Sequence, residues 1–298
     1  MNRFWGFFYG LLASASYGLI PLFTLPLVAS GLRVDSILFY RFFFACLVIG
    51  LVLVLKREPL GARLVDIGKL FLLSTLYSMS AIFYFLSFAH MASGIATTIH
   101  FLYPVFVAII MMVLFREKKS PITLTAIALA VSGVALLSSG GQNQHISLLG
   151  LVLVLISSVA NASYIVGMSR AGIRNLSGLK TTFFLLLFGS FFTLLFSLTQ
   201  GTFQPVQESS IILRLLLLAL ITGALSNMCL IESIKRIGST LSSIIGALEP
   251  VTAVCVGVFV FHEPFTSRIS LGILLILSAV LLIILSAHIA TLFRSRKI

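Results

Sequence analysis

The sequence is poor in charge. Only 9% of its 298 residues are Asp, Glu, Lys or Arg, whereas 59% are hydrophobic. A soluble domain carries about a quarter charged residues, so this composition excludes a water-soluble fold. Lipid must cover side chains that no protein interior could hold, and the chain is predicted to be an integral membrane protein.

Acidic residues are the scarcest charged type, with 8 against 20 basic residues and a net charge of +12. The basic residues form no sustained run and lie in short gaps between apolar stretches. That placement is more typical of membrane orientation than of a phosphate-binding face. We therefore expect the lipid bilayer and a small-molecule substrate as partners, no nucleic acid, and no obligatory protein partner.

Cysteine and familiar catalytic motifs are also scarce. The three cysteines, Cys46, Cys229 and Cys255, lie inside apolar stretches without CxxC spacing and are interpreted as small hydrophobes. No P-loop, G-x-S-x-G, paired acidic motif or histidine cluster is present. We predict no enzyme, no metal and no cofactor, and no ATP-driven pump within this chain.

What the chain does contain is a repeat of itself. Equally spaced pairs include Pro104 with Pro250, Phe115 with Phe261, Glu117 with Glu263, and Ser132 with Ser278. Ala13-x-Ala15-Ser16-Tyr17 is matched by Ala160-x-Ala162-Ser163-Tyr164. Many secondary transporters are built from such duplicated halves, with the substrate site where the halves meet.

The apolar stretches predict ten membrane spans, because a bilayer core about 30 Å thick needs roughly 20 apolar residues in a helix. The predicted spans are Phe4–Leu27, Ser36–Leu55, Leu70–Ala89, Ser93–Phe115, Thr123–Ser138, Leu148–Met168, Leu179–Thr199, Ile211–Ile231, Thr240–Phe261 and Ser270–Leu292.

The basic residues predict the orientation. Most lie at the two termini and in the even-numbered loops, whereas the odd-numbered loops and the span ends beside them hold only Arg33, Arg214 and Arg268. The positive-inside rule then places both termini of this multi-pass protein in the cytoplasm, with the chain in the cytoplasmic (inner) membrane. Five spans per half is an odd number, so the halves insert in opposite orientations. The prediction is an all-α membrane protein of ten transmembrane helices, arranged as two inverted-topology five-helix repeats (1–139 and 148–293), with a short basic cytoplasmic tail (294–298).

The repeated signature carries a family resemblance. Leu102-Tyr103-Pro104 with Phe115-Arg116-Glu117, and Leu248-Glu249-Pro250 with Phe261-His262-Glu263, resemble the EamA family of the drug/metabolite transporter superfamily. Arg41 matches a basic residue common in the second span of that family, and Leu179–Thr199 has no counterpart of it. The resemblance implies that spans one, three, four, six, eight and nine surround a cavity, while spans five and ten pack outside. Members of the family move amino acids, vitamins, nucleotide-like metabolites and drugs.

Ionisable residues inside spans are the first candidates for a substrate site, because such a group costs about 2.5–3.5 kcal/mol at the bilayer centre. Glu249 falls near the middle of its span and is predicted to bind an amine or carry a proton; the alternative is a buried, protonated structural carboxyl. His100 is either a cavity residue or a satisfied core histidine. Arg41 either contacts an anionic group, snorkels to the surface or pairs with a local acid.

Tyrosines and amides form polar stripes on several spans. Helix packing is the alternative explanation for such stripes, but these lie mainly on the spans that the resemblance places at the cavity. Tyr103 occupies the position in the first repeat that Glu249 holds in the second. The candidates of this kind are Tyr17, Tyr77, Tyr84, Tyr103, Asn161, Tyr164 and Asn227.

Pro104 and Pro250 lie at corresponding positions within spans four and nine. Proline removes a backbone hydrogen bond and loosens a helix, and helix breaks in corresponding places of two repeats point to the binding region. We predict that both prolines are hinges. Glu117 and Glu263 end their spans and are interpreted as structural.

Together these features predict an alternating-access secondary transporter of a small polar metabolite, an amino acid or a derivative, working as an exporter. Proton coupling is open, and so is a multidrug or vitamin/nucleoside-type carrier. A membrane-embedded enzyme or assembly factor would need convergent catalytic groups, which the sequence does not show.

Overall fold

The computed structural model describes residues 2–59, 61–116, 121–138, 147–171, 173 and 176–295, and all regular structure in these ranges is helical. Glu117, Lys118 and Gln144 lie outside them. The elements are α1 (Asn2–Gly18), α2 (Ile20–Ala29), α3 (Val34–Leu55), α4 (Leu64–Ser87), α5 (Ser93–His100), α6 (Tyr103–Leu114), α7 (Pro121–Ser138), α8 (Leu148–Arg170), α9 (Gly178–Thr199), α10 (Ser209–Leu218), the π-helix η1 (Ala219–Leu225), α11 (Ser226–Gly246), α12 (Leu248–Phe261) and α13 (Ser267–Ser295).

The predicted all-helical membrane character is confirmed. Within the described residues, 7 helical stretches are long and apolar enough to cross a membrane, and they coincide with predicted spans one to four and six to eight. Three shorter apolar helices, Leu124–Leu137, Leu248–Phe261 and Ser267–Leu282, coincide with spans five, nine and ten. Large apolar side chains such as Leu64 and Phe259 are 86% and 77% exposed, as expected where lipid replaces water. The ten-span count and the inverted arrangement stay predictions.

Three of the predicted spans are broken helices. The sequence predicts the first span as one continuous helix, but the structure divides it at Leu19 into α1 and α2. The break arises because Pro21 has no backbone N–H to donate to the preceding turn. The fourth divides at Phe101 and Leu102, just before Pro104, and the ninth divides at Ala247, before Pro250. The second and third breaks thus occupy corresponding positions in the two halves.

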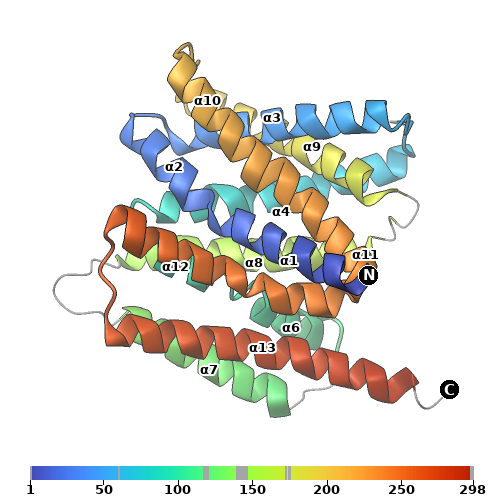
Figure 1. The fold of residues 1–298 in the computed structure, drawn as a ribbon, viewed down its shortest axis with the longest axis vertical. Helices are drawn as coiled ribbons and strands as arrows, with labels where there is room; N and C mark the ends of the chain where they lie inside the picture. The colour runs from blue at the N-terminus through green and yellow to red at the C-terminus, as the bar shows by residue number, and fades with distance from the viewer. Residues whose placement is uncertain are drawn as a thin grey trace.

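The prediction of a loop between Ile231 and Thr240 is wrong, because α11 is helical throughout this segment. A side chain at Gly10 would lie 2.8 Å from Ser233 and 3.0 Å from Ile245. Ser233 and Ile245 are twelve residues apart in sequence, and in a straight helix they would be separated by about 18 Å. Because both lie next to Gly10, α11 must be sharply bent. The chain reverses within it and returns through α12 (Figure 1). The boundary between span eight and span nine is therefore a bend in a helical segment.

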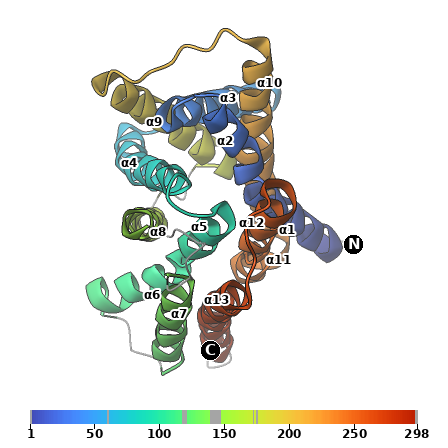
Figure 2. The ribbon, with the colours of Figure 1, turned by 90° about the vertical axis from the view of Figure 1, so that its left-hand side faces the viewer.

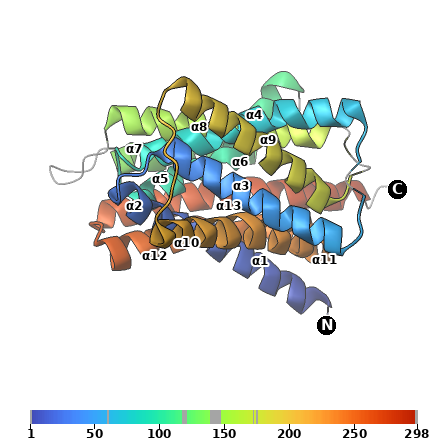
Figure 3. The same cartoon turned by 90° about the horizontal axis from the view of Figure 1, so that it is seen from above.

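The helices run between two ends of the bundle (Figures 1 and 3). At one end, which we call the α5 end, α3, α5, α8 and α10 begin and α4, α9 and α12 finish. The other, the N-terminal end, is where α1 and α9 begin. Viewed nearly along the helices, α3, α4, α8 and α9 lie on one side and α1, α11 and α12 on the other (Figure 2). The pair α7 and α13 packs at one edge of the bundle (Figure 2).

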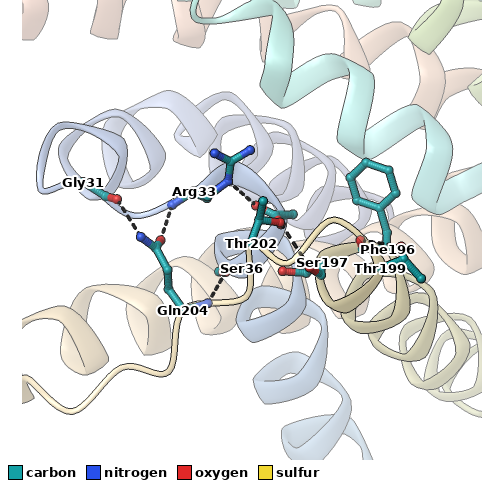
Figure 4. Close-up of polar contacts among 9 residues, drawn as sticks. Gly31, Arg33, Ser36, Phe196, Ser197, Thr199, Thr202 and Gln204 are labelled. Carbon is teal, nitrogen blue, oxygen red and sulfur yellow. Dashed lines mark hydrogen bonds and ion pairs between the residues drawn. The ribbon is translucent and has the colours of Figure 1, made fainter.

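At the α5 end, the loop after α9 is tied to the start of α3 (Figure 4). Gln204 accepts from the Arg33 amide at 2.7 Å and donates to the Gly31 carbonyl at 3.2 Å, and its own amide donates to Ser36 Oγ at 3.0 Å. The Thr202 hydroxyl donates to Asp35. These bonds join the two halves of the chain outside the cavity described next.

Candidate functional site

A cavity of about 270 Å³ lies between the two sides of the bundle. Side chains from α1 to α6, α8, α9, α11 and α12 line it, and no described residue of α7 or α13 does. The lining residues are Tyr17, Ile20, Arg41, Tyr77, Ser80, Ala81, Tyr84, His100, Tyr103, Asn161, Tyr164, Ile165, Thr182, Leu185, Leu186, Asn227, Leu230 and Glu249.

The structure brings all ten predicted site residues to this one cavity, although they come from distant parts of the sequence. Pro104 and Pro250 are not lining residues, but each directly follows one, Tyr103 and Glu249 respectively. The broken helices therefore place Tyr103 and Glu249 in the first turns of α6 and α12. That these residues bind a substrate stays a prediction.

Aromatic rings form much of the wall. Tyr84 stacks on His100 with ring centroids 4.6 Å apart, and Tyr103 lies 6.1 Å from the same imidazole. Tyr77 lies 5.3 Å from Tyr164. These pairs present both ring faces and hydroxyl groups, which suit a solute that is partly apolar and partly polar.

His100 joins the cavity wall to α8. Its Nδ1 is 3.0 Å from Ser157 Oγ, and its backbone carbonyl accepts from the Ser158 hydroxyl at 2.9 Å. Ser157 also donates to the Ser80 carbonyl at 2.7 Å. The histidine is thus both a cavity residue and a hydrogen-bonded one, so the two alternatives drawn from the sequence are not exclusive.

Arg41 is a buried cation, with only 4% of the residue exposed. Its Nη2 donates to the Thr222 carbonyl in η1 at 3.2 Å, and the guanidinium lies over the rings of Phe85 and Phe42 at 5.5 and 5.9 Å. Its Nε has no hydrogen-bond partner. Among the described residues no carboxylate pairs with it, so it neither snorkels nor has a local acid for a partner.

Glu249 is the acidic residue of the cavity. It lies in the first turn of α12, where the positive end of the helix dipole favours a negative charge. In the part of the chain that the structure describes, no donor hydrogen-bonds to its carboxylate. A carboxyl group that faces a cavity and has no hydrogen-bond donor among the described residues is available to a ligand.

Sequence reasoning missed part of the lining. The ring of spans implied by the family resemblance omits the second, which contributes Arg41, and the seventh, which contributes Thr182, Leu185 and Leu186. Apolar lining residues give no signal in a chain where almost every span is apolar. Thr182 lies near a helix start, where a threonine is unremarkable.

The cavity can bind and orient a solute, since it offers a guanidinium, a carboxyl group, aromatic faces and the amides of Asn161 and Asn227. Within the described residues no group of three or more His, Cys, Asp or Glu side chains could hold a metal ion.

Comparisons with known proteins agree with this architecture. The model of the EamA-like transporter family matches residues 4–139 and 148–285. The chain is 26% identical over 267 residues to "Uncharacterized transporter YvbV" of Bacillus subtilis (strain 168), covering 87% of this chain and 82% of that protein. It is 29% identical over 297 residues to "Protein LicB" of Haemophilus influenzae, covering 92% and 95% respectively.

A solved crystal structure also shares the fold. It aligns with 96% of this chain and 97% of its own chain, with a TM-score of 0.65 at 15% sequence identity. At that identity the likeness concerns the arrangement of the helices alone.

Proposed function

The chain belongs to the EamA-like transporter family, and we propose that it is a secondary carrier of a small zwitterionic metabolite, an amino acid or a close derivative. Membrane transport itself is supported by the family and by relatives named as transporters. The substrate class is our proposal, and the paired charges of the cavity carry it.

The charges of Arg41 and Glu249 suit the two ends of a zwitterion. The guanidinium has unused donor capacity at Nε and makes no salt bridge to a described carboxylate, and a carboxylate is the group that a guanidinium binds best. The carboxylate of Glu249 suits an ammonium group. A substrate with both charges would neutralise both residues, whereas a polyphosphate would meet only one cation.

The size of the cavity supports a small solute. Pockets for drug-sized ligands range from about 300 to 1,000 Å³, and this cavity of about 270 Å³ lies just below that range. The five tyrosines in its wall favour an amino acid with an apolar or ring-bearing side chain. The volume disfavours the multidrug alternative, whose substrates are larger.

The broken helices support alternating access. Carriers with inverted repeats bind substrate beside interrupted helices and rock one group of helices against the other. Here the breaks before Pro104 and Pro250 occupy corresponding places in the halves and flank the cavity. We place both termini in the cytoplasm from the basic loops and propose export across the cytoplasmic membrane, with proton coupling open.

A counterflow screen in proteoliposomes tests the proposal. The panel contains amino acids, vitamins and nucleosides, each measured with and without a pH gradient. Counterflow of at least one zwitterionic amino acid above protein-free vesicles supports the proposal. Counterflow confined to nucleosides, vitamins or larger apolar compounds would select the alternative.

A further inference from the structure

A carboxylate outside the cavity holds two helices together at the α5 end. Glu263, just after α12, accepts hydrogen bonds from the Ser93 amide and the Ser93 hydroxyl, each at 2.7 Å, and from the Gly94 amide at 3.3 Å. These groups begin α5, whose first amides have no partner inside the helix. One residue of the second half therefore caps a cavity-lining helix of the first half.

Two glycines allow this junction to be close. A Cβ on Gly94 would lie 2.8 Å from Val254 Cα, so the backbones of α5 and α12 meet there without side chains between them. A Cβ on Gly257 would lie 2.1 Å from Glu263 Oε2, so the absence of a side chain makes room for the carboxylate. Gly94 thus allows the two helices to meet closely, and Gly257 leaves space for the Glu263 carboxylate.

The junction connects directly to the cavity wall. The Thr97 hydroxyl donates to the Ser93 carbonyl at 2.8 Å and is 2.6 Å from the Tyr84 hydroxyl. Tyr84 in turn stacks on His100, the last residue of α5. Any movement of α5 away from α12 would therefore change the surroundings of two cavity residues.

The position of the junction suits a gate. Among the described residues, Thr182, in the second turn of α9, extends the cavity toward the N-terminal end. No residue from the first turn of α5 or the last turns of α12 lines it. A carrier with alternating access must open its cavity to each side in turn, so the α5–α12 junction has to separate when the α5 end opens.

We propose that Glu263 is the residue that holds this gate closed, so that its three hydrogen bonds are broken and remade in each transport cycle. This role rests on the proposed alternating access, but it does not depend on which solute is carried. It replaces the purely structural interpretation of Glu263 drawn from the sequence.

Sided cysteine labelling tests the gate. In a chain whose three native cysteines are replaced by alanine, Ala81→Cys places a reporter in the cavity. Phe265→Cys, at a site 52% exposed beside Glu263, shows which face of the membrane the α5 end occupies. An impermeant thiol reagent is applied to intact cells and to inverted vesicles, for the parent and for Glu263→Gln.

We expect Glu263→Gln to raise the labelling rate of the cavity reporter about tenfold from the α5 side only, because a hydrogen bond to a charged group is lost from the closed state. The control is Glu208→Gln, which changes an exposed carboxylate at the start of α10 at the same end and should change nothing. An unchanged rate, or an equal rise from both sides, would overturn the proposal. If the Gln variant does not fold, Ser93→Ala removes a single donor and should give a smaller rise from the same side.

A double-mutant cycle separates the gate from general loosening. Gly257→Ala should displace the carboxylate and raise labelling in the parent, but should add little in a Glu263→Ala chain, where no carboxylate remains to displace. Equal effects in both chains would contradict the assignment. These labelling results stand even if the counterflow screen finds no zwitterion, so the two proposals can fail separately.

Discussion

The Glu249→Gln substitution separates the roles open to the central carboxylate. Glutamine keeps the shape and hydrogen-bonding ability of glutamate and removes the charge. In the described residues the carboxylate has no protein donor, so the change removes little that holds the fold. If Glu249 binds the substrate ammonium, the loss is that of a hydrogen bond between charged groups, about 1.5–3 kcal/mol, or roughly a 10- to 100-fold weaker affinity.

The assay is concentration-dependent counterflow in proteoliposomes, with equal protein incorporation and unchanged thermal stability as evidence of folding. Glu208→Gln, at an exposed position outside the cavity, is the matched control and should behave like the parent. If Glu249 instead carries a coupling proton, counterflow should persist while accumulation driven by a pH gradient disappears. A Gln variant with parental affinity, rate and pH response would refute both roles and leave a structural carboxyl.

Further predictions concern the hinges, the cation and the topology. Pro104→Ala and Pro250→Ala should leave the protein folded and slow exchange, because continuous helices oppose the access change; unchanged rates in both would make the prolines packing features. Arg41→Gln should weaken binding of a zwitterion about tenfold or more, measured by competition, while an amine without a carboxylate binds as before; equal loss for both would exclude a carboxylate contact. An impermeant thiol reagent added outside should label a cysteine at Gln144 but not at Lys118, and the opposite pattern would refute the predicted topology.

The helical membrane character and the composition of the cavity were predictable because they depend on features that the sequence displays directly. Ionisable and amide side chains are rare inside the spans, and those singled out from the sequence, such as Asn161 and Glu249, do meet in the cavity. The repeat marked Pro104 and Pro250, and the helices do break just before them.

Other features depend on packing that no local pattern displays. The bend within α11 arises from tertiary context, and an apolar residue such as Leu185 faces the cavity or the core with the same sequence signal. Ser93 and Gly94, the partners of Glu263, are 170 and 169 residues away in sequence. A carboxylate at a span end predicts a water interface, and only the folded chain shows that it caps α5.

Competition in counterflow by charge-deleted analogues tests the central claim most directly. For the best amino acid found in the screen, the competitors are the amino acid itself, its decarboxylated amine and its deaminated acid. If Arg41 and Glu249 bind opposite ends of a zwitterion, the intact amino acid should compete best, and each analogue should compete about tenfold or more weakly, because each lacks one charge-assisted hydrogen bond. An amine or an acid that competes as well as the amino acid would contradict the account.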